Sequence, residues 1–153
     1  MSEPIDSFSG EWSFLSNFFR SNVWPQWWPH TLPPFPTVEH AFQACKVEPG
    51  QGANIWLMQV EVIRSVSSPG RAKRLGRRVM LRPNWEEIKI GTMFFLLDQK
   101  FRDESFCHLL LCTGERELIE GNKWGDTFWG VCDGEGENHL GRLLMEIRAD
   151  RRG

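Results

Sequence analysis

The segment Thr37–Glu48, TVEHAFQACKVE, has the pattern of a helix with one buried stripe and one polar stripe. Thr37 follows a proline and suits the N-cap position. Val38, Ala41 and Cys45 recur at helical spacing, which predicts one apolar face. The neighbouring stripe has the same spacing and carries mainly polar side chains, namely Glu39, Phe42, Gln43 and Lys46. A polar stripe beside an apolar one can line a cleft, so this helix is the first candidate for a site.

The rest of the chain also reads as mostly helical. Further helices are predicted over residues 53–66, 84–101 and 104–112, and the second of these is expected to be the longest and most buried. Another helix is predicted to start at Ser68 and Pro69 and to run to about Val79, and a last one is predicted after Asn138. Strand candidates are Glu117–Glu120 and Phe128–Cys132. We therefore predict a single compact α+β domain over residues 1–153, with a core of about 8–148, that is mostly helical with a small β-sheet.

The segment Trp24–Pro36, WPQWWPHTLPPFP, is predicted to be an extended, aromatic-rich excursion on the surface. It contains five prolines and three tryptophans. Prolines at this density exclude a helix or a central strand. Two roles remain open for the tryptophans: they cover the core, or they add aromatic surface for the base of a ligand.

Composition and charge exclude several classes of protein. The net charge of −2 argues against a general duplex-binding protein, because such binding needs an excess of Lys and Arg. The basic residues between Arg71 and Arg78 are expected to form a solvated helix face. The longest apolar run, Met93–Leu97, is far shorter than the roughly 20 residues of a membrane span. The N-terminus does not resemble a signal peptide, and the cysteines form no CxxC or zinc spacing. We therefore expect a cytoplasmic protein with reduced thiols, no bound metal and no membrane association.

A second candidate site is the glycine-rich stretch Gly121–Gly141, GNKWGDTFWGVCDGEGENHLG. Asp126 lies between Trp124 and Trp129, and Gly134 and Gly136 precede Asn138, which is expected to cap the last helix. Glycines allow close approach of a ligand, aromatic rings allow stacking, and a helix N-terminus offers free N–H groups to an anion. The stretch therefore predicts either a site for a nucleotide-like molecule or a tight loop that closes the fold.

Individual side chains add to these two candidates. Glu39 lies in the first helical turn, where the helix dipole favours a carboxylate that stays ionised. Lys46 lies on the same stripe and either enters the site or extends to solvent. Trp85, at the start of the longest predicted helix, is either a core anchor or a stacking surface. Asn17, beside Phe18, can contact the edge of a base or bond to the backbone.

Five segments in order along the chain resemble the NADAR (YbiA-like) family: FSGEWSFLSNFF, FPTVEHAFQACK, SSPGRAKRLGR, RPNWEEIK and WGDTFWGVCDGEGENHLGRLLMEIR. The resemblance covers nearly the whole chain. It implies a small α+β, mostly helical domain that hydrolyses N-glycosidic bonds of ribosylated compounds. The family's glutamate falls on Glu39, its lysine on Lys46, the tryptophan of its NW motif on Trp85 and the aspartate of its WGD motif on Asp126. The Trp24–Pro36 insert departs from the family pattern and reshapes the region before the helix that carries Glu39.

The chemistry of the implied reaction agrees with these residues. Cleaving a ribose–nitrogen bond develops positive charge at the anomeric carbon, which Glu39 can stabilise while Asp126 orients water. Lys46 binds a phosphate or ribose hydroxyl, or its amine attacks the anomeric carbon and forms a Schiff base. The catalytic residues are thus predicted to be Glu39, Asp126 and Lys46, with Asp126 on the opposite wall. The predicted substrate-binding residues are Asn17, Phe18, Gln43, Trp85, Trp124, Trp129, Gly134, Gly136 and Asn138.

The expected substrate is an ADP-ribosylated compound, in particular ADP-ribosyl-guanine in a nucleoside or nucleic acid. A phosphoribosylated intermediate of riboflavin synthesis is the alternative substrate. A non-catalytic module that binds ADP-ribose or NAD is the alternative function. A nucleic-acid-binding role is disfavoured by the acidic balance unless the substrate is itself a modified nucleic acid. The enzyme is expected to need no cofactor and to be a monomer.

Overall fold

The computed structural model describes residues 2–153 and contains, within them, six α-helices, two 3-10 helices and four short strands. The mostly helical α+β fold predicted from the sequence is confirmed. The chain divides into two compact units. The central unit is Arg20–Lys100, and the terminal unit combines the residues up to Phe19 with Phe101–Gly153.

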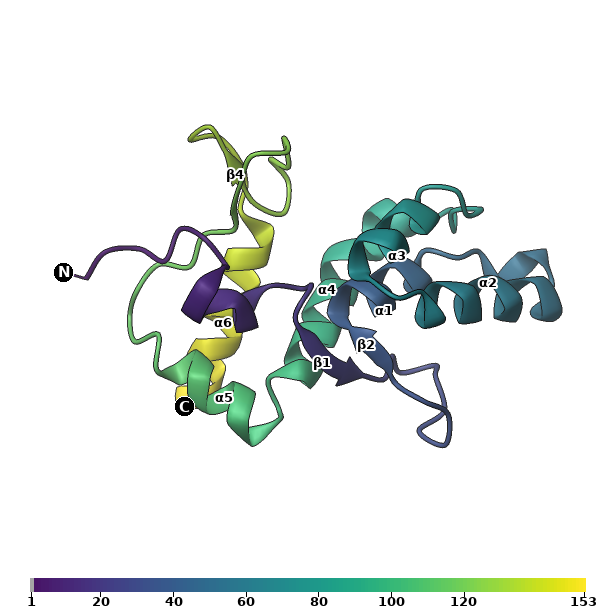
Figure 1. Ribbon diagram of the computed structural model, residues 1–153, viewed down its shortest axis with the longest axis horizontal. Helices are drawn as coiled ribbons and strands as arrows, with labels where there is room; N and C mark the ends of the chain where they lie inside the picture. The colour runs from purple at the N-terminus through teal and green to yellow at the C-terminus, as the bar shows by residue number, and fades with distance from the viewer. Residues whose placement is uncertain (1) are drawn as a thin grey trace. The chain divides into compact units, whose positions relative to one another are not determined.

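The central unit is built around one short, fully buried helix. Its elements are β1 (Arg20–Val23), β2 (Phe35–Thr37), α1 (Val38–Cys45), η2 (Pro49–Gln51), α2 (Ala53–Ser65), α3 (Pro69–Gly76) and α4 (Trp85–Lys100). Strands β1 and β2 pair antiparallel, and α1 lies among α2, α3 and α4 (Figure 1). All eight residues of α1 are buried. Helix α4 is the longest, as predicted, but the prediction that it is the most buried is wrong, because neighbours surround α1 on several sides.

Local signals fix where the helices of this unit begin. The Thr37 hydroxyl accepts a hydrogen bond from the His40 N–H at 3.1 Å, and the Ser68 hydroxyl accepts one from the Arg71 N–H at 3.2 Å. Both are the N-caps expected from the sequence. Helix α1 ends at Cys45, earlier than predicted, because the next residues pair with another segment. The Arg82 N–H donates to the Lys46 carbonyl at 2.9 Å, which holds Lys46 at the end of α1.

The Trp24–Pro36 insert packs on its own unit. Trp28 is only 4% exposed, and its ring lies edge-on to Phe35 at 5.3 Å between centroids. Trp27 contacts Trp28, Phe35 and Trp56. The Trp28 indole N–H donates to the Pro33 carbonyl at 2.9 Å, which closes the loop on itself. Of the two roles considered for these tryptophans, the packing favours the covering of the core.

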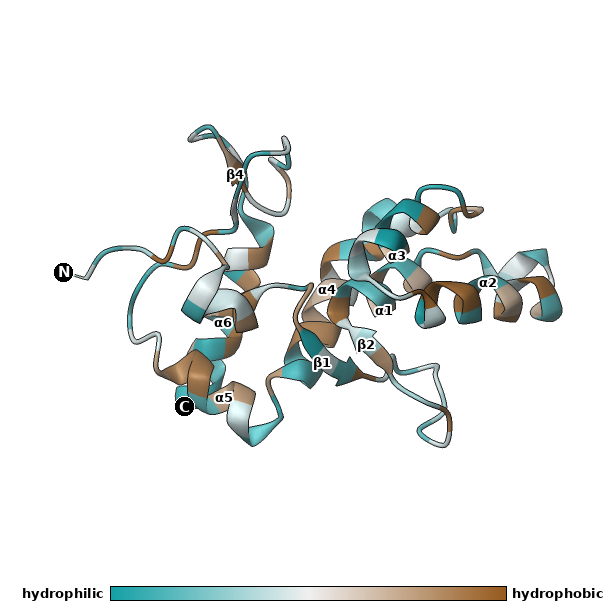
Figure 2. Cartoon of the chain, viewed as in Figure 1, coloured by the Kyte–Doolittle hydropathy of each residue, from teal (hydrophilic) through white to brown (hydrophobic). Residues whose placement is uncertain are grey.

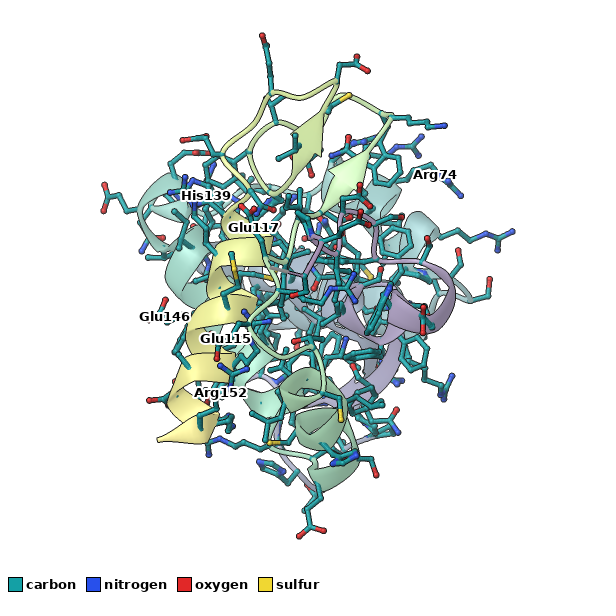
Figure 3. All side chains as sticks on the ribbon, turned by 90° about the vertical axis from the view of Figure 1, so that its left-hand side faces the viewer. Arg74, Glu115, Glu117, His139, Glu146 and Arg152 are labelled. Carbon is teal, nitrogen blue, oxygen red and sulfur yellow. The ribbon has the colours of Figure 1, made fainter. Side chains whose placement is uncertain are left out.

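The terminal unit contains η1 (Gly10–Leu15), α5 (Glu104–Leu111), β3 (Gly121–Asn122), β4 (Val131–Cys132) and α6 (His139–Arg152). Strands β3 and β4 pair in parallel and are shorter than the predicted strands, and Leu118 forms only an isolated bridge with Ile5. Figure 3 places His139, Glu146 and Arg152 along α6, and Arg152 pairs with Glu115. The buried Arg148 guanidinium donates to the Thr113 hydroxyl at 2.8 Å, so α6 is tied to the turn after α5.

Figure 2 shows hydrophobic turns along α2. The apolar residues of α2 include four exposed side chains, Ile55, Leu57, Met58 and Val62, as well as the buried Val60 and Ile63. No helix within residues 2–153 has the length and apolar character needed to cross a membrane.

Candidate active site

Four of the predicted site residues belong to the central unit, and three of them lie along α1 and just past its end. Gln43 Nε2 donates a hydrogen bond of 2.7 Å to Glu39 Oε1. The Lys46 ammonium lies 6.0 Å from the centroid of the Trp85 ring and 5.8 Å from that of Phe42. These two rings are 5.0 Å apart and tilted by 55°. A cation held against two aromatic faces keeps a defined position. The predicted stripe therefore forms a cluster that holds a carboxylate, an amide and an amine.

The helix geometry explains why these side chains share one face. Residues separated by three or four positions lie above one another on a helix. Glu39 is in the first turn, and its burial leaves it 7% exposed. Gln43 is 3% exposed, whereas Lys46 is half-buried. The polar stripe therefore runs from a buried carboxylate to an amine that solvent can reach.

Gln43 is fixed by α3 as well as by Glu39. A Cβ atom placed on Gly76 would lie 1.9 Å from Gln43 Oε1, so only glycine leaves room for this amide. Because Gln43 Nε2 is already bonded to Glu39, the amide cannot move away without breaking that bond. The packing of α1 on α3 therefore sets the orientation of the Glu39 carboxylate.

The surroundings of Lys46 lower the pKa of its amine on balance. Burial lowers the pKa of Lys46 below the ordinary value of 10.5, and the positive charges of Lys73, Arg77 and Lys89 lower it further. The Glu39 carboxylate acts in the opposite direction and raises this pKa. A lysine with a lowered pKa is a better nucleophile near neutral pH. The same three cations also make the region attractive to phosphate.

Asp126 belongs to the terminal unit, where its side chain organises a turn. Its Oδ1 atom accepts hydrogen bonds from the Phe128 N–H at 3.1 Å and the Trp129 N–H at 2.9 Å. The Asp126 backbone N–H donates to Asn122 Oδ1 at 3.0 Å, and Asn122 Nδ2 donates to the Asp126 carbonyl at 2.8 Å. Asp126 is therefore held firmly in a half-exposed loop, with one carboxylate oxygen engaged in the turn.

The N-terminus of α6 does not offer the free amides expected from the sequence. The N–H groups of four successive residues, Glu137, Asn138, His139 and Leu140, donate to the carbonyls of Thr127, Gly130, Phe128 and Trp129. The premise that these groups face an anion is therefore wrong. The Asn138 side chain does not cap the helix either; it bonds to the Leu118 carbonyl and the Glu120 N–H.

Gly134 and Gly136 meet backbone requirements. Asp133 and Gly134 both have positive φ angles, 51° and 79°, in a two-residue turn between Cys132 and Glu135. These two positive angles are those of a type I′ turn, which favours glycine at its second central position. A Cβ atom on Gly136 would lie 2.1 Å from the Gly130 carbonyl oxygen. The backbone conformation and packing already explain why glycine stands at positions 134 and 136, and the hydrogen bonds of Asn138 explain the asparagine. Binding of a ligand by Gly134, Gly136 and Asn138 stays a prediction.

The remaining predicted residues of the terminal unit differ in accessibility. Trp124 is 67% exposed, whereas Trp129 is half-buried and lies edge-on to Phe128 at 4.9 Å. Asn17 is buried, and Phe18 is 46% exposed. Trp124 and Phe18 are thus the aromatic side chains of this set that are most open to a ligand.

Sequence reasoning missed several residues that shape these clusters. Lys73 and Arg77 were grouped with a solvated face, although their charges act on Lys46. Asn122 was not singled out, because its bonds to Asp126 depend on the conformation of the intervening loop. Among the described residues, no group of three or more His, Cys, Asp or Glu side chains is arranged to hold a metal ion.

Comparisons with known proteins agree with the resemblance seen in the sequence. The NADAR domain matches residues 7–152. N-glycosidase YbiA of Escherichia coli (strain K12) is 41% identical over 118 residues, which is 74% of this chain and 69% of YbiA. The NMR structure of the E. coli protein YbiA matches with a TM-score of 0.75 and 34% identity, over 98% of this chain and 86% of that one.

Two further relatives are longer proteins. Riboflavin biosynthesis protein PYRR, chloroplastic, of Zea mays is 38% identical over 129 residues, 76% of this chain. Riboflavin biosynthesis protein VVA0006 of Vibrio vulnificus (strain YJ016) is 33% identical over 143 residues, 90% of this chain. The matched region is 20% of the maize protein and 35% of the Vibrio protein, so the chain corresponds to only one part of each.

Proposed function

The chain belongs to the NADAR family, and we propose that it is an N-glycosidase that hydrolyses the ribose–nitrogen bond of an ADP-ribosylated compound. The favoured substrate is ADP-ribosyl-guanine, in a nucleoside or in nucleic acid. The observation that carries the proposal is the cluster of Glu39, Gln43 and Lys46, where a buried carboxylate is oriented by an amide and lies near an amine of lowered pKa.

In this proposal Glu39 faces the anomeric carbon. Departure of the base leaves positive charge on the ribose, and a fixed carboxylate stabilises that charge more than water can. Gln43 holds the carboxylate in one orientation, since its amide is pinned between Glu39 and Gly76. Lys46 has two candidate roles: as a neutral amine it attacks the anomeric carbon, and as a cation it binds a phosphate or a ribose hydroxyl.

The charges around Lys46 support a substrate with a diphosphate. Lys73, Arg77 and Lys89 add three positive charges near the amine. Lys89 is also paired with Glu86 at 2.6 Å, whereas the other two have no carboxylate partner within residues 2–153. The diphosphate of ADP-ribose can use more than one cation, which favours it over a single phosphate.

A second candidate is an N-glycosidase that acts on phosphoribosylated intermediates of riboflavin synthesis. The names of the maize and Vibrio relatives favour it. The packing of Trp28 in the core, and of Trp27 on Phe35, also weakens the aromatic insert as support for a larger ligand, although Trp27 keeps 37% of its surface exposed. A module that binds ADP-ribose without turnover is disfavoured, because a pure binding site needs no carboxylate at the anomeric carbon.

For the terminal unit we propose that the second oxygen of Asp126 orients water or a hydroxyl, and that Trp124 stacks on a base. Exposure favours Trp124 over Trp129, since Trp129 already packs on Phe128. Removing a stacking ring weakens ligand binding by about 1–3 kcal/mol. Quenching of tryptophan fluorescence by ADP-ribose should therefore shrink in Trp124→Ala, and unchanged quenching and affinity would remove Trp124 from the site.

One experiment separates the candidate substrates. The purified protein is incubated with ADP-ribosylated guanosine, an ADP-ribosylated oligonucleotide and a phosphoribosylaminopyrimidine, and the released base and sugar are quantified. Release from the first two supports the favoured substrate, and release from the third alone supports the second candidate. Binding of ADP-ribose with no release from any of the three would support the non-catalytic module.

A further inference from the structure

A groove on the central unit is lined by three arginines and two apolar side chains. Arg71, Arg74, Arg78, Val66 and Leu75 surround a cavity of about 280 Å³. The three arginines recur at spacings of three and four, so they share one face of α3 and its C-terminal end. Ala72 and Gly76 are buried instead. The groove is therefore built from the side of α3 that carries the arginines.

The wall formed by Val66 is anchored to the core. His40 Nε2 donates to the Val66 carbonyl at 3.0 Å, and the Thr37 hydroxyl lies 2.8 Å from His40 Nδ1. Since a carbonyl only accepts, the proton is on Nε2 and Nδ1 accepts from Thr37. The pKa of His40 is lowered, mainly by burial, which agrees with a neutral ring. The turn between α2 and α3 is thus held in a fixed position beside the arginines.

The charge of this segment is strongly one-sided. The stretch from Ser65 to Asn84 contains Arg71, Lys73, Arg74, Arg77, Arg78 and Arg82 and no acidic residue, in a chain of net charge −2. Within residues 2–153, none of the three groove arginines is paired with a carboxylate. Three guanidinium groups without a protein counter-charge leave the groove complementary to an anionic ligand.

We propose that this arginine groove binds the sugar–phosphate backbone of a single-stranded nucleic acid that carries the modified base. The inference rests on the proposed function and names the form of its substrate. Arg71 lies in the first turn of α3, and Arg78 lies just beyond the end of that helix, so the three guanidinium groups are spread over more than one helical turn, which exceeds a single phosphate. Val66 and Leu75 supply apolar contacts that suit a sugar or a base.

The same helix links the groove to the candidate active site. Lys73 and Arg77 belong to the neighbouring face of α3 and act electrostatically on Lys46. Positive charge therefore continues around α3 from the Glu39 and Lys46 cluster to the arginine groove. A strand of phosphates can follow such a track, whereas one small anion would occupy only a part of it.

Binding is tested without turnover, so that its result is independent of the enzymatic activity. Fluorescence polarisation with a labelled, unmodified oligothymidine is measured over a series of salt concentrations. The triple variant R71Q/R74Q/R78Q should bind about tenfold or more weakly, and the slope of log affinity against log salt should fall in magnitude by about 2. The single variant R142Q removes one exposed charge from α6 and should leave affinity and slope near wild type.

Equal affinity and slope in wild type and the triple variant would overturn the proposal, provided that circular dichroism shows both to be folded. Tighter binding of a duplex of the same length would overturn the single-stranded assignment.

A second measurement compares substrates of the active enzyme. The triple variant should keep its kcat/KM on ADP-ribosylated guanosine. Its kcat/KM on an ADP-ribosylated oligonucleotide should fall by about tenfold or more. Equal losses on both would mean that the groove holds the diphosphate of the ligand itself, which contradicts the proposal. If the wild type cleaves neither but binds oligothymidine through the groove, the proposed function fails and the binding surface stands.

Discussion

Gln43 donates a 2.7 Å hydrogen bond from Nε2 to Oε1 of Glu39, one helical turn before it. Both side chains are buried, so the bond orients the carboxylate where solvent does not compete. The proposed chemistry depends on this orientation, because a carboxylate stabilises a developing cation only from a fixed position.

Glu39→Gln should keep the fold and lower turnover by about a hundredfold or more, since the amide retains the shape and loses the charge. Release of base from the accepted substrate checks this, with circular dichroism to show that the variant is folded. Glu87→Gln removes an exposed carboxylate of α4 and serves as the matched control. Near-normal turnover of a folded Glu39→Gln protein would remove Glu39 from the catalytic role.

The pH profile should separate the two candidate roles of Lys46. Its pKa lies below 10.5, chiefly because of burial. If the neutral amine attacks the ribose, the rate should rise with pH through this lowered pKa, and borohydride should trap an adduct on Lys46. If the ammonium binds phosphate, affinity should fall over the same pH range and no adduct should form. Lys46→Ala with unchanged rate and affinity would contradict both roles.

Gly76→Ala should destabilise the protein by about 1–3 kcal/mol, because the new methyl group would overlap Gln43 Oε1. Turnover should also fall, since a displaced Gln43 no longer orients Glu39. Gly91→Ala on α4 is the control, because its Cβ would meet nothing within 4 Å and alanine favours a helix. Urea unfolding and kinetics measure both effects, and a fully stable, active Gly76→Ala protein would contradict the packing argument.

Asp126 allows its structural and catalytic contributions to be separated. Asp126→Asn keeps an acceptor for the N–H groups of Phe128 and Trp129, so stability should change little while turnover falls. Asp126→Ala removes the acceptor and should cost about 1 kcal/mol of stability in addition. Thermal unfolding and kcat are measured for both. A normal kcat in Asp126→Asn would show that Asp126 stabilises its turn and has no catalytic role.

Lys100 should make stability depend on pH. Burial lowers its pKa to about 7, while an unfolded lysine keeps 10.5. Between these values the unfolded chain binds a proton that the folded chain does not, so the free energy of unfolding should rise with pH by about 1 kcal/mol per unit. Lys100→Met should remove this rise, and Lys123→Met, at an exposed lysine, should not. Parallel pH curves for wild type and Lys100→Met would contradict the lowered pKa.

The sequence predicted most of the helices because their signals are local. Thr37 and Ser68 cap helices as expected, and Pro69 occupies a first helical position. The stripe of Glu39, Gln43 and Lys46 follows from helical spacing alone, and the structure brings its members together. The strands were predicted less well, since β3 and β4 are only two residues long and depend on their pairing with each other rather than on a local sequence pattern.

Helical periodicity fixes which side chains share a face of α1, since a helix repeats every 3.6 residues whatever surrounds it. Which polar groups already have hydrogen-bond partners depends instead on how the folded chain packs. The N–H groups at the start of α6 donate to the Thr127–Gly130 carbonyls, and Asn138 bonds to the segment around Leu118. Packing likewise placed Gly76 against Gln43 and left Arg71, Arg74 and Arg78 around a groove. These hydrogen bonds and the contact of Gly76 with Gln43 join residues that lie beyond one helical turn of each other in the chain, so helical spacing does not encode them.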